Sequence, residues 1–130
     1  MKIIETENAP KAIGTYSQAV NVNGFLFISG QIPLDPSTME LVEGIENQIN
    51  QVFENIRQIL KADGMDFSNV VKLSVLLDDL NHFEKVNEIM VSIFSKPYPA
   101  RAAYEVSKLP KGSSVAVSYT HLTLPTKSGV

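Results

Sequence analysis

The sequence contains no cysteine. Disulfide frameworks, thiolate nucleophiles, iron–sulfur clusters and thiolate zinc sites are therefore excluded, so any catalysis must proceed without a sulfur nucleophile. No uninterrupted apolar run approaches the roughly 18 residues that a membrane helix needs. Glu5 and Glu7, close to the start of the chain, are atypical of a secretory signal. We therefore expect a cytoplasmic protein without a membrane partner.

A surplus of positive charge is lacking as well. The 11 Lys and Arg residues stand against 14 Asp and Glu residues, for a formal net charge of −3. This balance provides no general field that would attract nucleic acid or anionic lipid. With 130 residues, of which 44% are hydrophobic, the chain is long enough for one globular domain with a sizeable core.

Familiar catalytic motifs are also absent. The sequence has no glycine-rich phosphate fingerprint, no P-loop, no zinc-protease motif and no nucleophile elbow. Its two histidines, His82 and His121, lie far apart in the chain. A histidine outside a motif is more often a surface residue than a metal ligand. The sequence therefore predicts no metal site.

The first half of the chain predicts a hairpin and then a helix. Residues 17–22 and 25–29 flank Asn23-Gly24, the dipeptide that most readily takes the positive φ angles of a tight turn. After a loop rich in proline, apolar residues recur at steps of three and four. This spacing predicts a helix over residues 44–63, and Gly64 suits the left-handed position that closes it.

The second half predicts a strand, a helix and two further strands. Residues 70–77 are rich in β-branched side chains, and alternate positions are wholly apolar, as in a strand packed beneath helices. Asn81 is the predicted cap of a helix whose apolar stripe begins at Phe83. Strands are predicted over residues 100–106 and 115–119. In the predicted strand over residues 70–77, the wholly apolar alternate positions are Val71, Leu73, Val75 and Leu77.

The order of these elements predicts a sheet with one bare face. Both helices link strands as crossovers, and such crossovers are almost always right-handed, so both helices should cover the same face. The opposite face carries apolar residues from segment 25–28, and a monomer would expose them as a patch. We therefore expect the chain to associate with copies of itself and to form a site between subunits.

Three segments and one isolated asparagine, Asn87, hold side chains suited to a small ligand. Each also has an ordinary structural interpretation: Tyr16 as a core aromatic residue, Gly30 as a strand end, and Arg101 as a surface charge facing Glu105. The segments are Gly14-Thr15-Tyr16-Ser17-Gln18-Ala19, Ser29-Gly30-Gln31-Ile32-Pro33, and the stretch from Pro99 through Arg101 and Glu105-Val106 to Leu109-Pro110.

Together these segments resemble the RidA/YjgF/Rid family of enamine and imine deaminases. The resemblance extends from about Ile4 to Val115 and rests on Gly-x-Tyr-Ser-Gln-Ala, Ser-Gly-Gln-Ile-Pro and Pro-x-Arg-x-x-x-Glu-Val-x-x-Leu-Pro, in that order. It implies an α+β fold, a ferredoxin-like or chorismate-mutase-like sandwich with a mixed β-sheet and two helices packed on one face. It also implies a homotrimer with clefts between subunits and no cofactor.

The resemblance assigns catalytic roles to Arg101 and Tyr16. Arg101 falls on the family's carboxylate-binding arginine, whose planar guanidinium offers a bidentate fork to a 2-imino acid. Tyr16 matches the cleft tyrosine, which would close the pocket and provide a hydroxyl group. Further substrate-binding positions would be Ser29 and Asn87 as flanking polar groups, Gly30 for a close approach of the ligand, and the backbone N–H of Ala103.

The implied reaction is hydrolysis of a reactive enamine or imine, such as 2-iminobutanoate or 2-iminopropanoate, to a 2-keto acid and ammonia. In the family, a glutamate on the last strand is credited with positioning water and moving protons. Ala116 stands at that position here, and Glu105 is a candidate substitute. The departure predicts that carboxylate binding survives better than turnover.

The end of the chain departs from the family pattern. Residues 118–130 have little likeness to it, and Pro125 would interrupt a closing strand. We therefore expect a RidA-like domain over residues 1–117 and an atypical tail over residues 118–130, which is either foreign, frame-shifted or a divergent native terminus.

Two other functions stay open. One is a regulatory protein of the translation-inhibitor or ribonuclease type, as some relatives are described. The acidic net charge and the lack of a basic, aromatic stripe argue against RNA as the main ligand. The other is a non-catalytic trimer that captures small carboxylates, which needs only Arg101 and a formed cleft.

Overall fold

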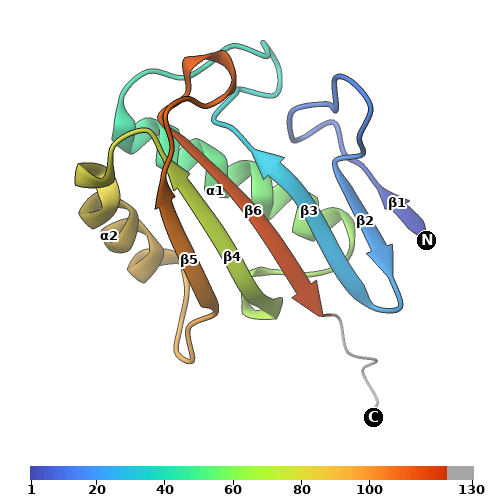
Figure 1. Cartoon of the computed structure of the whole chain (residues 1–130). Coiled ribbons are helices and arrows are strands. Elements are labelled where there is room, and N and C mark those ends of the chain that lie inside the picture. Colours follow the sequence, from blue (N-terminus) through green and yellow to red (C-terminus); the bar gives the residue numbers. More distant parts are fainter. Residues whose placement is uncertain (123–130) are drawn as a thin grey trace.

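One six-stranded sheet organises the computed structural model, which describes residues 1–122 (Figure 1). Short 3-10 turns precede β4, α2 and β6, and are labelled η1 (Phe67–Asn69), η2 (Leu80–His82) and η3 (Pro110–Gly112). In chain order the strands and helices are β1 (Lys2–Ile4), β2 (Ala19–Val22), β3 (Phe25–Gln31), α1 (Ile45–Ala62), β4 (Val70–Leu77), α2 (Phe83–Ile93), β5 (Ala100–Glu105) and β6 (Val115–Leu122).

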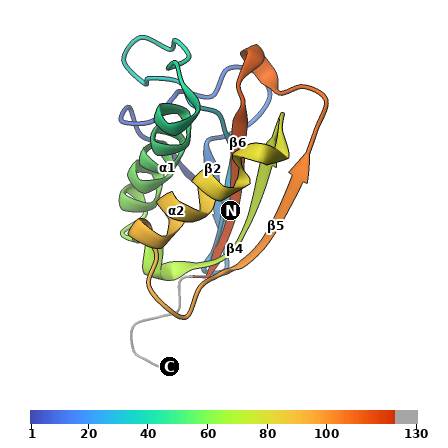
Figure 2. The ribbon, with the colours of Figure 1, turned by 90° about the vertical axis from the view of Figure 1, so that its left-hand side faces the viewer.

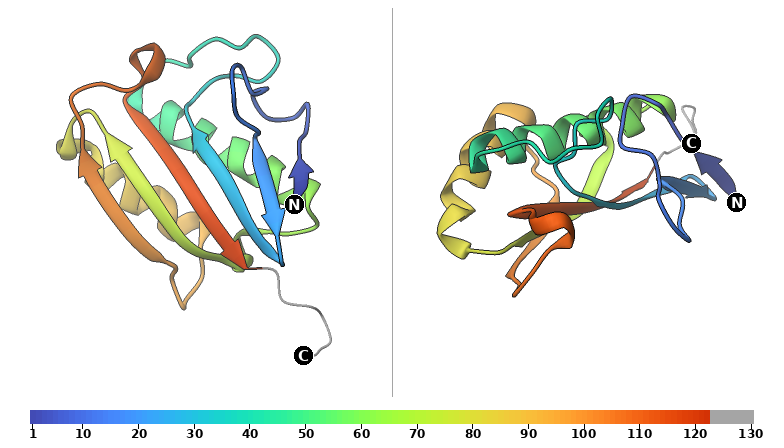
Figure 3. Two further views of the ribbon diagram at one scale, coloured as in Figure 1. Left: turned by 45° about the vertical axis from the view of Figure 1, so that its right-hand side comes forward. Right: turned by 90° about the horizontal axis from the view of Figure 1, so that it is seen from above.

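The sheet is mixed, with strand order β1-β2-β3-β6-β4-β5. β4 and β5 pair in parallel, whereas the other neighbours are antiparallel. α2 connects β4 to its neighbour β5, and α1 connects β3 to β4, between which β6 inserts. Figures 2 and 3 show both helices on one side of the sheet. The predicted α+β sandwich is therefore confirmed.

The predicted hairpin and first helix are both present. Asn23 and Gly24 have φ angles of 51° and 85°, and positive values at both central residues match the twist of the two strands that they join. The apolar face of α1 is almost fully buried in the core. Gly64, at φ 71°, follows the helix, and the Met65 N–H reaches back to the Leu60 carbonyl oxygen at 2.9 Å. That bond satisfies a carbonyl group that the helix end leaves free.

Two local predictions were wrong. Val71 is 46% exposed and Val70 is buried, because the pairing of β4 with β6 shifts between Val70 and Lys72. A one-residue shift of this kind reverses which side chains face the core. Asn81 does not cap α2. It lies in η2, where its N–H donates to the side chain of Asp79 at 2.9 Å.

The last strand extends beyond the expected end of the domain. β6 runs to Leu122 between β3 and β4, so strand pairing continues past residue 117. Pro125 and the rest of segment 123–130 lie outside the described residues. No helix within residues 1–122 combines the length and apolar character needed to cross a membrane.

The sheet has a helix side and an open face, which we define by Phe25, Phe27 and Tyr104. Along β3, Leu26 and Ile28 are buried on the helix side, so the alternate residues Phe25 and Phe27 point the other way. Their rings stack with centroids 6.4 Å apart. These three aromatic side chains are between 41% and 56% exposed, so the predicted apolar patch is present.

Candidate functional site

Arg101 lies on β5 and points to the helix side, because it is in register with the buried Leu73 of β4. Three residues of α2 contact its guanidinium. Nη1 donates to Oδ1 of Asn87 at 2.5 Å and lies 3.5 Å from the sulfur of Met90. The guanidinium carbon is 4.5 Å from the centroid of the Phe83 ring. The three residues share one face of α2 because they are spaced at about one helical turn.

The charge of Arg101 has no carboxylate partner within residues 1–122. The ion pairs of that part of the chain all belong to Lys2, Arg57 and Lys85. The guanidinium of Arg101 contacts instead an amide oxygen, a thioether and an aromatic ring, all of them neutral. Since a guanidinium carries five N–H donors, most of them remain available to an anionic ligand.

Glu105 lies on the same side of β5 as Arg101, yet no ion pair joins them. One of its carboxylate oxygens accepts the Leu80 N–H at 2.9 Å, which ties the end of β5 to η2. The structure thus gives Glu105 a structural contact at the start of the α2 segment.

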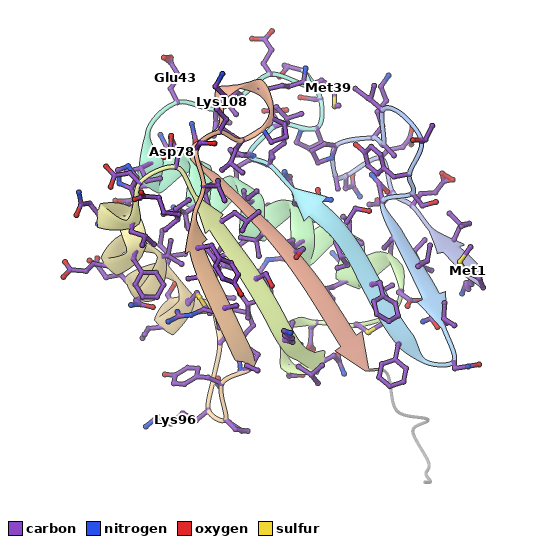
Figure 4. All side chains as sticks on the ribbon, in the orientation of Figure 1. Met1, Met39, Glu43, Asp78, Lys96 and Lys108 are labelled. Carbon is purple, nitrogen blue, oxygen red and sulfur yellow. The ribbon has the colours of Figure 1, made fainter. Side chains whose placement is uncertain are left out.

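A hollow of about 350 Å³ lies beside Arg101. It is lined by Asn87, Met90, Val91, Tyr98, Pro99 and Arg101. Apolar walls therefore meet the guanidinium and an amide, which suits a small molecule with one charged and one apolar end. The loop between α2 and β5, marked by Lys96 in Figure 4, lies at this end of the sheet, opposite Asp78 and Lys108.

Ala103 presents its backbone at the edge of the sheet. β5 is one of the two edge strands of the described sheet, and the Val106 N–H donates to the Leu77 carbonyl oxygen of β4 at 2.8 Å. Because peptide groups alternate in direction along a strand, the N–H groups of Arg101 and Ala103 point away from β4. The Ala103 side chain packs against the core, while its N–H faces outward from the sheet.

Tyr16 lies in the loop between β1 and β2 and is 53% exposed, so it is not a core aromatic residue. Its hydroxyl oxygen accepts the Ile13 N–H at 3.2 Å. The ring borders a second hollow of about 680 Å³ at this loop, with Thr6, Lys11 and Ser17 among its walls.

Gln18 supports this loop, a role that the sequence interpretation missed. Its side chain is buried, with the whole residue 4% exposed. The side-chain Oε1 of Gln18 accepts the Thr6 N–H at 2.7 Å. Its side-chain Nε2 lies within hydrogen-bond distance of the backbone carbonyl oxygens of Thr6, Ala9 and Pro10, at 3.0, 3.3 and 2.8 Å. The available signal was the position of Gln18 in the Tyr-Ser-Gln-Ala motif.

Ser29 and Gly30 lie beside the same loop. The Ser29 hydroxyl donates to the Ser17 carbonyl oxygen at 2.6 Å, and its N–H donates to the Gln18 carbonyl oxygen at 3.0 Å. Gly30 is exposed where the pairing of β3 with β6 shifts register. A Cβ atom at Gly30 would meet nothing within 4 Å, so packing within this chain does not require glycine there.

One chain does not bring the two groups of residues together. Four interstrand spacings of about 4.8 Å separate β2 from β5, which is about 19 Å. The β1–β2 loop and the α2–β5 loop also lie at opposite ends of the sheet (Figure 1). Arg101, Asn87 and Ala103 therefore form one group, while Tyr16 lies in another with Ser29 and Gly30.

Ala116 lies apart from both groups. It pairs with Leu76 of β4 on the open face and is 6% exposed, whereas Arg101 points to the helix side. His82 is half-buried in η2. Within residues 1–122, no group of three or more His, Asp or Glu residues is placed to hold a metal ion. The predicted lack of a metal and of a cofactor stays a prediction.

The fold and the Arg101 group define a small α+β sandwich protein with a candidate site for a small anion. A family model described as endoribonuclease L-PSP matches residues 6–120. The human 2-iminobutanoate/2-iminopropanoate deaminase is 51% identical over 117 residues, which cover 89% of this chain and 85% of the human protein.

Solved structures agree with this likeness. RidA from the Antarctic bacterium Psychrobacter sp. superimposes with a TM-score of 0.91 at 49% identity, covering 94% of this chain and 99% of that one. E. coli TdcF with bound serine gives a TM-score of 0.91 at 35% identity, covering 95% and 100%. The chain therefore belongs to the RidA/YjgF family.

Proposed function

We propose that this protein binds the carboxylate of 2-imino acids such as 2-iminobutanoate and 2-iminopropanoate through Arg101, and hydrolyses them to 2-keto acids and ammonia. The observation that carries the proposal is the guanidinium of Arg101, which is held by neutral groups and has no carboxylate partner within residues 1–122. Two relatives support this choice of ligand. The human relative is named for this reaction, and TdcF binds serine, which also carries a carboxylate.

The complete site would lie between copies of the chain in a homotrimer. The exposed aromatic residues of the open face give a reason for self-association. A cyclic trimer joins two different patches of the same chain. Arg101 and Tyr16 are both exposed and lie about 19 Å or more apart in one chain. The Arg101 edge of one copy would therefore meet the Tyr16 loop of the next.

In such a cleft the groups would divide the work by their chemistry. Arg101 would bind the two carboxylate oxygens, and the outward N–H of Ala103 would donate one further bond. Asn87 would fix the guanidinium through its 2.5 Å contact. Tyr16 would close the cleft with its hydroxyl near the imine nitrogen, and Ser29 and Gly30 would form the wall beside it.

Hydrolysis needs a proton acceptor and donor, and Ala116 supplies neither. Water adds to the imine carbon, and the resulting carbinolamine loses ammonia as its hydroxyl becomes the keto group, so the water oxygen remains in the product. Without an acid–base side chain these proton transfers rely on Tyr16 and solvent, and general acid–base groups contribute typically 10²- to 10⁴-fold. We expect Ala116→Glu to raise the rate substantially. Equal rates before and after the change would show that the glutamate is not the missing element.

The test supplies the imine in the assay from a 2-amino acid and an amino-acid oxidase, and follows the decay of the imine above its spontaneous rate. Arg101→Ala should lose at least tenfold in rate, because the substrate carboxylate loses a charge-assisted pair. Arg57→Ala is the matched control, since that guanidinium is paired with Glu54 at 3.2 Å and should change the rate by less than about twofold. Equal rates for Arg101→Ala and the unchanged protein would refute the proposal.

Ala116, which cannot transfer protons, also favours an alternative function, namely the capture of small carboxylates without turnover. Binding of 2-oxobutanoate without faster imine hydrolysis would support it. A salt-dependent affinity for RNA, measured beside the deaminase assay, would instead support the ribonuclease-type alternative. The cytoplasmic location and the division into residues 1–117 and 118–130 stay predictions.

A further inference from the structure

The chain has two arginines, and both guanidinium groups lie over a phenyl ring. The guanidinium carbon of Arg57 is 4.8 Å from the centroid of Phe67, and that of Arg101 is 4.5 Å from the centroid of Phe83. The two differ in their counter-charge. Arg57 donates to the carboxylate of Glu54 at 3.2 Å, whereas Arg101 has no carboxylate partner among the described residues.

A ring and a carboxylate hold a cation in different ways. The negative face of a phenyl ring attracts the guanidinium but offers no lone pair to its N–H groups. A carboxylate neutralises the charge and occupies up to two of the donors. At Arg101 the ring of Phe83 lies against the cation, and Asn87 and the sulfur of Met90 each accept from Nη1. The remaining donors stay available for a ligand.

The Phe83 ring is itself held in place. Phe83 is the first residue of α2 and packs, partly buried, against the hydrophobic core. The 3-10 turn before it is anchored by Glu105, whose carboxylate accepts the Leu80 N–H at 2.9 Å. Glu105 and Arg101 belong to the same strand, so β5 carries the guanidinium and also anchors the start of the helix whose ring lies over it.

We propose that Phe83 is a positioning residue, which holds Arg101 by a cation–π contact. The charge and the N–H donors of the guanidinium then remain available to the carboxylate of a 2-keto or 2-imino acid. The inference rests on the proposed function, because it concerns how Arg101 presents itself to that ligand. It adds a residue outside the sequence motifs and a physical reason for the neutral contacts of Arg101.

The test compares Phe83→Leu, which removes the ring, with Phe83→Tyr, which keeps an aromatic face. Affinity for 2-oxobutanoate is measured by calorimetry. The NMR signals of the two arginine Nε–H groups are recorded as well, because the ring current of a phenyl ring beneath a guanidinium changes the chemical shift of that Nε–H group. Phe67→Leu is the matched control, since it removes the ring from Arg57 instead. Phe83→Met replaces Phe83→Leu if the latter fails to fold.

We expect Phe83→Leu to change the chemical shift of the Arg101 signal and to weaken 2-oxobutanoate binding by about three- to fivefold. Phe83→Tyr should bind within about twofold of the unchanged protein. Phe67→Leu should displace only the Arg57 signal, lower the stability, and leave the affinity within about twofold.

Two results would overturn the inference while the proposed function stands. One is unchanged affinity in Phe83→Leu although the Arg101 signal has moved. The other is an equal loss in Phe83→Leu and Phe83→Tyr, which would assign the effect to packing. If instead Arg101→Ala and the unchanged protein bind 2-oxobutanoate equally well, the proposed function itself fails, and the inference fails with it.

Discussion

Replacing Gln18 by leucine removes the amide that ties residues 6–10 to the start of β2. The side chain is buried and has four hydrogen-bond contacts with the backbone of Thr6, Ala9 and Pro10. Leucine fills a similar volume, so the loss is mainly that of hydrogen bonds, each contributing about 0.5–1.5 kcal/mol net. Thr6 is only half-buried, so water can replace part of its loss. We expect the free energy of unfolding to fall by about 2–4 kcal/mol.

Urea unfolding followed by circular dichroism measures this change, and hydrogen exchange should show faster exchange over residues 6–16. Gln58→Leu is the matched control. That glutamine lies on α1 and makes one exposed bond, to Glu54 at 2.7 Å, so its loss should stay within about 0.5 kcal/mol. A Gln18→Leu variant as stable as the Gln58→Leu variant would refute the role assigned to the buried amide.

Three further predictions concern charge, acid stability and assembly. Asn87→Asp would place a carboxylate against Arg101, so calorimetry should show at least tenfold weaker 2-oxobutanoate binding; unchanged affinity would contradict the proposed anion site. Hydrogen bonds from the hydroxyl and N–H of Ser68 hold the pKa of Asp66 below its ordinary value of 3.8. A carboxylate with a lowered pKa stabilises the fold above pH 3.8, and this stabilisation is lost as the pH falls through the pKa of the folded state. Asp66→Asn should therefore make the urea midpoint depend less steeply on pH below about pH 4. An unchanged pH dependence of the midpoint would contradict this. Phe27→Lys on the open face should shift the protein to monomers in sedimentation equilibrium, and an unaltered assembly would show that this face is not the interface.

Local patterns predicted the hairpin and α1 because both depend on neighbours in the sequence. Asn23-Gly24 favours positive φ angles whatever surrounds it, and the stripe from Ile49 to Leu60 is apolar at helical spacing. β3 is different, since both of its alternate sets are apolar. Leu26 faces the core and Phe27 the open face because the helices cover one side of the sheet, and that choice is a property of the whole fold.

The wrong predictions have the same kind of cause. Val70 and Val71 are equally suited to burial, and the shift in pairing with β6 that buries Val70 has no sequence signal of its own. Before α2, three residues can accept a backbone N–H, namely Asp78, Asp79 and Asn81. Asp79 forms the cap of η2, and choosing among the three requires the backbone path.

The candidate site could be predicted only in part, because its members come from distant segments. Phe83 and Asn87 are four residues apart and so share a face of α2, but their contact with Arg101 depends on the crossover that lays α2 against β5. Gln18 was missed because its partners are 8 to 12 residues earlier, in a segment with no periodic pattern.

The amide at position 87 is informative because an aspartate of the same shape would have given Arg101 an ion pair. An exposed ion pair contributes only about 0–1 kcal/mol to folding, so the fold loses little by having asparagine there. A hydrogen bond between a charged group and a ligand contributes about 1.5–3 kcal/mol, and a guanidinium already paired with a carboxylate would lose much of this contribution to ligand binding. Arg57 shows the opposite arrangement, since Glu54 pairs with it on the surface of α1. An asparagine beside Arg101 is therefore what selection for anion binding would retain, whereas selection for stability alone would have no reason to prefer it over aspartate.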